Sequence, residues 1–275
     1  MWFADIGERI AWSVVAVWAL VATVVLATRR TTLGRLVPAQ VRTPVLVGAG
    51  ATSLLLVAQA AVVDHVADLG APGLADRDVW AWFVDHRAEP VTFVMKGVSV
   101  LTDIPQMTVL AIVAAVLLWR IRRRPEAAVV LAATIGATLL VDGFKRLYDR
   151  VRPPAAARLM TENNPALPSG HALGSIVVLG VLAAVVVLAT RHTLLRVAVV
   201  VTAALGVITI GVSRLYLDVH WLTDVVTGWL LGGAWLAVCV TTLCVVTRRR
   251  ALASMGSVGQ VGAEDAPVGR AESPA

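Results

Sequence analysis

Residues 168–189 read PSGHALGSIVVLGVLAAVVVLA, and two features of this stretch decide the fold. After the histidine it contains no charged residue and runs for about 20 residues, the length that an α-helix needs to cross the hydrocarbon core of a bilayer. At its start, Pro168 ends a loop, Ser169 is a favoured N-cap residue, and Gly170 lets backbone N–H groups approach an anion. The stretch therefore predicts a membrane-spanning helix over 172–190 with an anion-binding first turn.

Apolar stretches of this length recur along nearly the whole chain. Of the 275 residues, 58% are hydrophobic and only 15% are charged, and the mean hydropathy is +0.79. This composition predicts an all-α, polytopic transmembrane helical bundle. Asp103 and Pro105 interrupt the beginning of the third expected span, which should therefore be shorter than the others. We expect about seven spans, at residues 10–28, 44–63, 98–119, 126–144, 172–190, 195–213 and 222–247.

The arginines of the loops predict how the spans are oriented. Arginine clusters follow the first, third, fifth and seventh spans, and by the positive-inside rule the loops that carry them lie in the cytoplasm. These clusters are Arg29, Arg30, Arg35 and Arg42; Arg120, Arg122, Arg123 and Arg124; Arg191 and Arg196; and Arg248, Arg249 and Arg250. The N-terminus, the loop 64–96 and the two remaining loops then face outward. The sequence thus predicts a multi-pass protein of the cell membrane with a cytoplasmic C-terminus.

Three short segments beside these spans contain basic residues and two of the five histidines. They are 145–153 (KRLYDRVRP), 168–171 (PSGH) and 213–224 (SRLYLDVHWLTD). The first follows the fourth span, the second begins the fifth, and the third joins the sixth to the seventh. Because these helix ends all point outward in the predicted topology, we expect the segments to meet in one site at the outer membrane face, open to water but beside lipid.

The residue types in these segments suit the handling of a phosphate group. A phosphoryl group in transfer spreads negative charge over three oxygens, so its catalysis depends on fixed positive charge and N–H donors. Lys145, Arg152 and Arg214 can supply the charge. The backbone around Ser169 and Gly170 can supply the donors. The nucleophile has to be neutral and basic near neutral pH, which indicates a histidine.

The two histidines have different expected roles. His220 and Asp224 are four residues apart, which places them on one face of a helix. The carboxylate can then accept a hydrogen bond from one ring nitrogen and leave the other free to attack phosphorus. His171 lies in the expected first turn of its helix, where it can protonate the leaving oxygen and later activate water. The sequence therefore predicts His220, His171 and Asp224 as catalytic residues.

The order of these motifs resembles that of the type 2 phosphatidic acid phosphatase family. The pattern K-x6-R-P is matched at Lys145, Arg152 and Pro153, the pattern P-S-G-H at 168–171, and the pattern S-R-x5-H-x3-D at 213–224. The resemblance implies a metal-independent membrane phosphatase that needs no cofactor. It also implies a phosphohistidine intermediate and activity on lipid phosphates and pyrophosphates.

The resemblance covers roughly residues 90–247 of this chain. The family usually has six helices, which makes the first expected span an additional N-terminal helix. One departure lies in the first motif, because many members continue it with a second R-P pair where this chain has Pro154 and Ala155. The missing cation bears on headgroup preference rather than on the reaction.

These observations divide the chain into three parts. We expect an additional helix and cytoplasmic loop at 1–43, a phosphatase core at 44–247, and a disordered cytoplasmic tail at 248–275 that is rich in Gly, Ala, Ser and acidic residues. The expected partners are a lipid phosphate substrate and membrane lipids. Nucleic acid is not expected, because the basic residues are scattered among membrane loops. Cys239 and Cys244 lie on one apolar helix without metal-site spacing, so no metal is expected either.

Other interpretations exist for the same residues. Each motif alone fits a solvated basic loop beside a membrane helix or an ordinary i,i+4 pair. A transporter would explain many helices, and a non-hydrolytic lipid-binding protein would explain the cations, but neither needs His171 together with His220 and Asp224. A soluble branch of the family holds vanadate for halide oxidation, which the spans count against. Phosphatidate, phosphatidylglycerol phosphate, a polyprenyl pyrophosphate and lysophospholipid phosphates all fit as substrates.

Two further features predict how parts of the chain are placed. The loop 64–96 contains Trp80 and Trp82 and is expected to lie on the membrane interface as an anchor, or to cover the substrate as a lid. Gly228 and Gly232 have the spacing of two small residues on one helix face, which we assign to close helix packing rather than to dimerisation.

Overall fold

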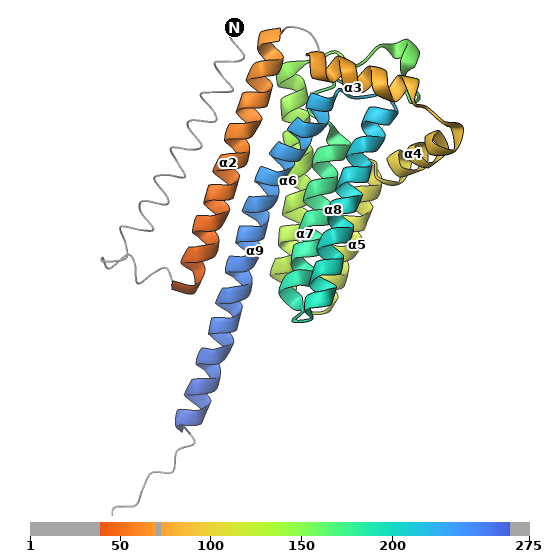
Figure 1. The fold of residues 1–275 in the computed structure, drawn as a ribbon. Coiled ribbons are helices and arrows are strands. Elements are labelled where there is room, and N and C mark those ends of the chain that lie inside the picture. The colour runs from red at the N-terminus through yellow and green to blue at the C-terminus, as the bar shows by residue number, and fades with distance from the viewer. Residues whose placement is uncertain (1–38, 70–72, 265–275) are drawn as a thin grey trace, which may run out of the picture.

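The computed structural model describes residues 39–69 and 73–264, and all secondary structure within these two ranges is helical (Figure 1). The all-α class expected from the composition is therefore confirmed. The helices are α2 (Ala39–Leu69), α3 (Leu74–Asp85), α4 (Glu89–Leu101), α5 (Ile104–Arg120), α6 (Arg124–Tyr148), α7 (Gly170–Ala189), α8 (Thr193–Tyr216) and α9 (Leu222–Glu264), with a short 3-10 helix, η3 (Ala155–Ala157), between α6 and α7.

Five of these helices, α2, α6, α7, α8 and α9, are long and apolar enough to cross a membrane. The pair α4 and α5, bent by 52°, passes the same test together, which gives six candidate spans if this pair is one broken span and five if it is a re-entrant loop. The protein is thus a multi-pass membrane protein, and each predicted span from 44–63 onward corresponds to a helix or to this bent pair. The expected first span, 10–28, lies outside the described residues.

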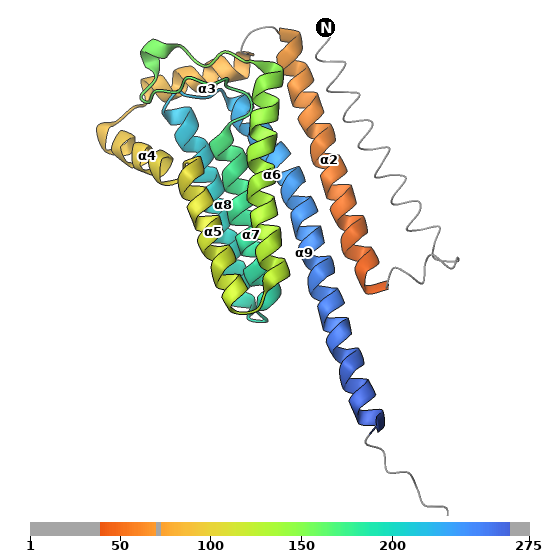
Figure 2. The same cartoon turned by 180° about the vertical axis from the view of Figure 1, so that it is seen from behind.

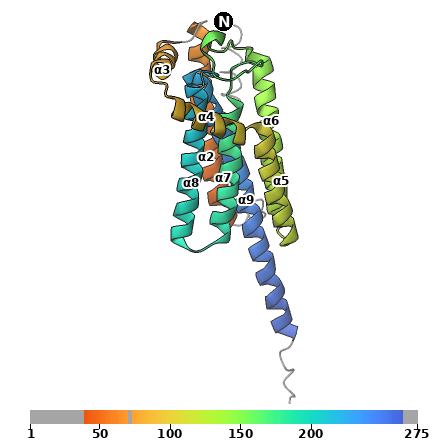
Figure 3. The ribbon, with the colours of Figure 1, turned by 90° about the vertical axis from the view of Figure 1, so that its right-hand side faces the viewer.

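The bend between α4 and α5 falls where the third span was predicted to be interrupted. Asp103 caps α5, because its carboxylate accepts a hydrogen bond from Ile104 N at 2.8 Å. Pro105 follows in the first turn, where a missing N–H is tolerated. As a result α4 leaves the line of α5 and packs against α8 (Figure 3).

The centre of the bundle is α7, which packs against α5, α6, α8 and α9, while α2 packs along α9 (Figures 1 and 2). The core between these helices consists largely of small and β-branched side chains. Examples that are fully buried are Val130, Ala133, Val177 and Val181. Such side chains let neighbouring helices approach closely, which is how helix bundles pack in a membrane.

One end of the bundle is covered by α3, which lies crosswise to the spans (Figures 1 and 2). The last turns of α6 and α8 and the first turns of α7 and α9 all lie at this end. The segment expected as an interfacial loop, 64–96, therefore contains the end of α2, all of α3 and most of α4. This arrangement brings four helix ends and α3 together.

The last helix, α9, continues to Glu264, well past residue 247 where the seventh span was expected to end. The residues that follow position 247 begin RRRALASM, most of which favour helix, so the helix extends beyond its membrane-spanning part. Residues 248–264 of the expected tail are thus helical, and 265–275 lie outside the described residues.

The two glycines of α9 lie against the backbone of α7. A Cβ atom at Gly228 would lie 2.8 Å from the Ser169 carbonyl oxygen, and one at Gly232 would lie 2.9 Å from the Leu173 carbonyl oxygen. Real Cβ atoms do not come this close to backbone oxygens, so only glycine allows the approach. The small residues therefore pack α9 against the start of α7, as the spacing predicted.

We expect Gly228→Ala to destabilise the protein by about 1–3 kcal/mol, because the added methyl group would overlap the Ser169 oxygen. Gly143→Ala on α6 is the matched control, since a Cβ atom there meets no atom within 4 Å. The control should be neutral or more stable by up to about 1 kcal/mol. Thermal unfolding in detergent measures both variants, and equal midpoints would contradict the packing described.

Candidate active site

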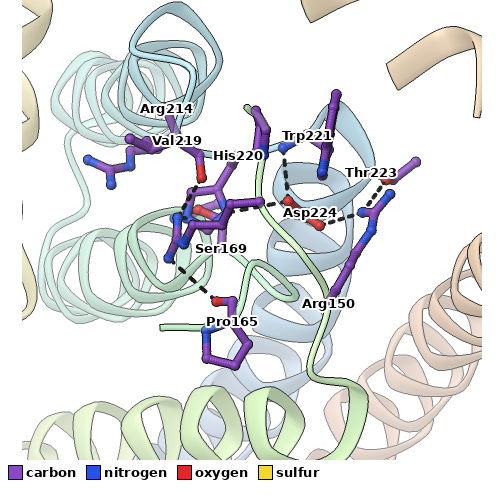
Figure 4. Close-up of polar contacts among 12 residues, drawn as sticks. Arg150, Pro165, Ser169, Arg214, Val219, His220, Trp221, Thr223 and Asp224 are labelled. Atoms are coloured by element: carbon purple, nitrogen blue, oxygen red, sulfur yellow. Dashed lines mark hydrogen bonds and ion pairs between the residues drawn. The ribbon is translucent and has the colours of Figure 1, made fainter. Parts of the chain in front are cut away.

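The three polar segments of the sequence meet at the end of the bundle that α3 covers (Figure 4). Arg152 Nη1 lies 3.2 Å from His220 Nε2, which joins the segment after α6 to the segment before α9. Ser169 N donates a hydrogen bond of 3.0 Å to the Asp224 carbonyl oxygen, which joins the start of α7 to α9. The structure therefore brings together the helix ends that the topology predicted to converge.

His220 lies in the short loop between α8 and α9, and its side chain is 2% exposed. The prediction that His220 and Asp224 share one helix face is therefore wrong, because α9 begins only at Leu222. Its Nε2 contacts Arg152 Nη1, which can only donate, so Nε2 carries the lone pair and the proton is on Nδ1. Nδ1 lies 3.5 Å from Asp224 Oδ2 and has no hydrogen-bond partner among the described residues. Burial, and then the charges of Arg152 and Arg214, hold the pKa of His220 well below its ordinary value. The imidazole is therefore neutral near neutral pH.

Asp224 lies in the first turn of α9 and is fully buried. Its Oδ2 accepts a hydrogen bond from Trp221 N at 2.8 Å, and its Oδ1 accepts one from Arg150 Nη1. The carboxylate is thus held from two sides, with Oδ2 facing His220 (Figure 4). A negative charge is also favoured at this place by the N-terminal end of the α9 dipole.

Arg152 and Lys145 are held by one asparagine of the loop before α7. Arg152 Nε donates to the Asn164 carbonyl oxygen at 2.7 Å, and Arg152 Nη2 donates to Asn164 Oδ1. Lys145 Nζ donates to the same Oδ1 at 2.6 Å. Burial lowers the pKa of Arg152 to about 10, so the guanidinium still carries its charge at neutral pH. Asn164 therefore keeps two cations close together beside the imidazole.

Arg214, at the end of α8, is fully buried. Its Nη1 donates to Ser99 Oγ of α4, and its Nη2 donates to Glu162 Oε1 at 2.5 Å. The other oxygen of Glu162 lies 3.6 Å from Arg152 Nη2. The two arginines thus hold one carboxylate between them, which shows that they are placed to share the oxygens of one anion.

His171 lies in the first turn of α7, where Ser169 is the N-cap and accepts a hydrogen bond from Ala172 N. His171 Nε2 lies 3.1 Å from the Ser99 carbonyl oxygen. Because a carbonyl oxygen only accepts, Nε2 is the protonated nitrogen and Nδ1 carries the lone pair. Ser99 therefore contacts both His171 and Arg214 and places them on the same side of α4.

Every residue predicted for the site lies at this end of the bundle. They are Lys145, Arg152, Ser169, Gly170, His171, Arg214, His220 and Asp224. Sequence reasoning did not identify Ser99, Arg150, Glu162 and Asn164, which contact these residues, or Asp76, which contacts Arg150. Arg150 stands inside the first motif and Asn164 and Glu162 precede the second, so nearness in sequence could have indicated these three. Asp76 and Ser99 are remote in sequence from their partners, and no local pattern marks them.

The polar groups of this site are mainly cations, imidazoles and N–H donors. Such a set suits a phosphate group, whose oxygens accept several hydrogen bonds at once. Within the ranges that the structure describes, no group of three or more His, Cys, Asp or Glu side chains is placed to hold a metal ion. The buried Cys239 and its neighbour Cys244 are both free thiols on α9, away from the site.

The chain is similar to known proteins over the part that contains these residues. Residues 126–249 match the sequence model of the PAP2 superfamily. Phosphatidylglycerophosphatase B of Bacillus subtilis (strain 168) is 35% identical over 98 residues, which are 34% of this chain and 46% of that protein, so the match spans less than half of the relative.

The fold is also similar to a solved structure, described as the first transmembrane PAP2 type phosphatidylglycerolphosphate phosphatase from Bacillus subtilis. The TM-score is 0.59 at 24% sequence identity, and the match covers 70% of this chain and 93% of that chain. The matched stretch of this chain, 126–249, contains all three motifs in order. Over residues 126–249 the chain is therefore similar to the PAP2 superfamily.

Proposed function

We propose that this protein is an integral-membrane phosphatase that hydrolyses the terminal phosphate of a lipid phosphate or pyrophosphate through a phosphohistidine intermediate. The observation that carries the proposal is the buried His220 imidazole, whose unprotonated Nε2 faces Arg152 while Arg152 and Arg214 share one carboxylate. A phosphate that takes the place of that carboxylate would present its phosphorus to a lone pair and its oxygens to fixed cations.

In the first step, His220 Nε2 attacks the terminal phosphorus. Lys145, Arg152 and Arg214 hold the charged oxygens, together with backbone N–H groups at the start of α7. The imidazole gains positive charge as the N–P bond forms, and Asp224 Oδ2 accepts the Nδ1–H hydrogen bond. Their separation of 3.5 Å shortens at this stage, as catalytic hydrogen bonds commonly do once substrate is bound.

His171 completes the first step and starts the second. For this step His171 carries a proton on both nitrogens, with Nε2–H donated to the Ser99 carbonyl oxygen. The bond from phosphorus to the leaving oxygen breaks, and that oxygen takes the Nδ1 proton, which leaves His171 neutral. His171 is then a base, and it accepts a proton from a water molecule that attacks the phosphohistidine. The N–P bond breaks, inorganic phosphate leaves, and His220 is again neutral.

The substrate class follows from the position of the site in the bundle. The arginines of the α5–α6 and α7–α8 turns lie at the opposite end from the site, and the positive-inside rule places that end in the cytoplasm. The site then lies at the outer interface, at the depth of lipid headgroups. Phosphatidylglycerol phosphate is the first substrate to test, because the Bacillus subtilis relative is named for that activity.

Phosphate release from a panel of lipids by the purified protein in detergent tests the proposal. The panel contains phosphatidylglycerol phosphate, phosphatidate, lysophosphatidate and a polyprenyl pyrophosphate, each assayed with an excess of chelator. We expect release from at least one lipid without added metal, and inhibition by vanadate, which mimics five-coordinate phosphorus. Release from none of them, or release only after a divalent ion is added, would refute this function.

The pH dependence of the reaction should reflect the environment of His220. The imidazole must be neutral to attack, so activity is lost as the pH falls through its pKa. Because burial and then Arg152 lower this pKa, the acid limb of kcat/KM should lie below the ordinary value of about 6.5. Arg152→Gln removes one charge that lowers the pKa, so its acid limb should move to higher pH. Superimposable acid limbs for the wild type and this variant would be inconsistent with the proposed environment.

A further inference from the structure

We propose that Asp76 of α3 is a positioning residue of this active site, acting through Arg150 and Asp224 on His220. The inference rests on the proposed function. Asp76 precedes the stretch 126–249 that matches the superfamily model, so it lies outside the three motifs.

The first observation is that α3 buries a charged residue. Asp76 is 1% exposed, whereas Trp82 of the same helix is 55% exposed. A buried carboxylate is costly unless it is paired with a cation and accepts hydrogen bonds. The placement of Asp76 therefore depends on what it contacts at the end of the bundle.

Asp76 accepts hydrogen bonds from the first turn of α9. Its Oδ1 accepts from Thr223 N at 2.9 Å, and its Oδ2 accepts from Thr223 Oγ1 at 2.8 Å. Thr223 N is one of the backbone donors that a helix leaves unpaired at its start, and such donors are usually satisfied by a nearby residue of the same chain segment. Here the acceptor comes from α3, so Asp76 fixes the position of the turn that carries Asp224.

Arg150 joins Asp76 to Asp224. Its Nη2 donates to Asp76 Oδ2 at 2.8 Å, while its Nη1 donates to Asp224 Oδ1 and to Thr223 Oγ1 (Figure 4). The guanidinium is a rigid, planar fork, so holding one end of it fixes the direction of the other. With Oδ1 of Asp224 bound to Arg150, Oδ2 is left facing His220 Nδ1 at 3.5 Å.

A second contact anchors the other end of α3. Arg87, which follows this helix, donates to the buried Asp218 and to the Ala157 carbonyl oxygen. Tyr216 Oη contacts the backbone of Ala88 at 3.0 Å. The α3 segment thus holds the chain both before and after His220, which supports a positioning role rather than a mobile cover.

Asp76→Asn tests the inference, because it keeps the size of the side chain and removes its charge. We expect kcat to fall about 10- to 100-fold, the usual effect of losing a partner that orients a reacting group, with KM little changed. Asp78→Asn is the matched control, since Asp78 is an exposed aspartate of the same helix and should leave kcat unchanged. Equal kcat values for the two variants, with an active wild type, would overturn this inference but leave the proposed function standing.

A double-mutant cycle distinguishes positioning from a loss of structure. If Asp76 acts through Asp224, Asp76→Asn should change kcat less than about 2-fold in an Asp224→Asn background. A double variant whose kcat falls by the product of the two single-variant losses would overturn the inference. If Asp76→Asn does not fold, Arg150→Lys takes its place, because lysine keeps the charge but lacks the planar fork. Arg150→Lys must then lower kcat by the same factor and show the same coupling to Asp224→Asn. An Arg150→Lys variant with wild-type kcat would overturn the inference. A wild type that neither releases phosphate nor binds vanadate would overturn both proposals.

Discussion

Phosphate release by the His220→Ala variant is expected to be at least about 1,000-fold slower than release by the wild type. Alanine removes the lone pair that we propose attacks phosphorus, and no other described side chain of the site offers a neutral nitrogen in the same place. His171 is not in the same place, because the hydrogen bond of its Nε2 to the Ser99 carbonyl oxygen holds the ring on the α4 side of the site. The initial rate with the best lipid of the panel measures the effect.

The control for this variant is His192→Ala. His192 is an exposed histidine before α8, at the opposite end of the bundle, and its loss should leave the rate unchanged. Unfolding midpoints of both variants establish that the fold is retained. A His220→Ala protein that keeps more than about a tenth of the wild-type rate would show that the nucleophile has been misassigned.

Arg214→Gln is expected to lower kcat by about 10³- to 10⁵-fold, the range that a charge-stabilising arginine contributes in other phosphoryl-transfer enzymes. The guanidinium is fully buried and shares Glu162 with Arg152, so glutamine would leave the developing charge on the phosphate oxygens without one of its two forked donors. Vanadate binding should weaken in parallel, since vanadate uses the same donors.

Arg196→Gln is the matched control for this substitution, because Arg196 is an exposed arginine near the other end of the same helix. It should keep both kcat and vanadate affinity. An Arg214→Gln variant that folds and loses less than about 10-fold in kcat would contradict the assigned role, since it would show that Arg152 and Lys145 suffice to hold the phosphate.

The helices could be predicted from the sequence because membrane spans depend on local composition. An apolar run of helical length has few alternatives, so the spans corresponding to α6, α7 and α8 were placed within a few residues. The bend at Asp103 was indicated by the capping residue and the proline that follows it. The length of α9 beyond residue 247 was not indicated, because hydropathy marks where a helix leaves the membrane and not where it ends.

The site could be predicted only in part, for a different reason. The motif residues were recognisable because of their residue types and their positions at helix ends. The expected shared helix face of His220 and Asp224 was wrong, since His220 lies in the loop before α9. Asp76 stands in an aromatic, acidic stretch typical of an interface, and its partner Arg150 is 74 residues away. Glu162 likewise resembles an ordinary loop residue until the structure places it between Arg152 and Arg214. Contacts between segments so far apart depend on tertiary packing, which local patterns do not contain.

The central claim, that His220 becomes phosphorylated, is tested most directly by trapping the intermediate. The protein is mixed with lipid substrate, quenched in base, in which phosphohistidine is stable, and mapped by peptide mass spectrometry. We predict phosphate on His220 in the wild type and none in His220→Ala. Phosphate on a different residue, or steady turnover with inversion of configuration at phosphorus and no phosphoenzyme, would contradict the account.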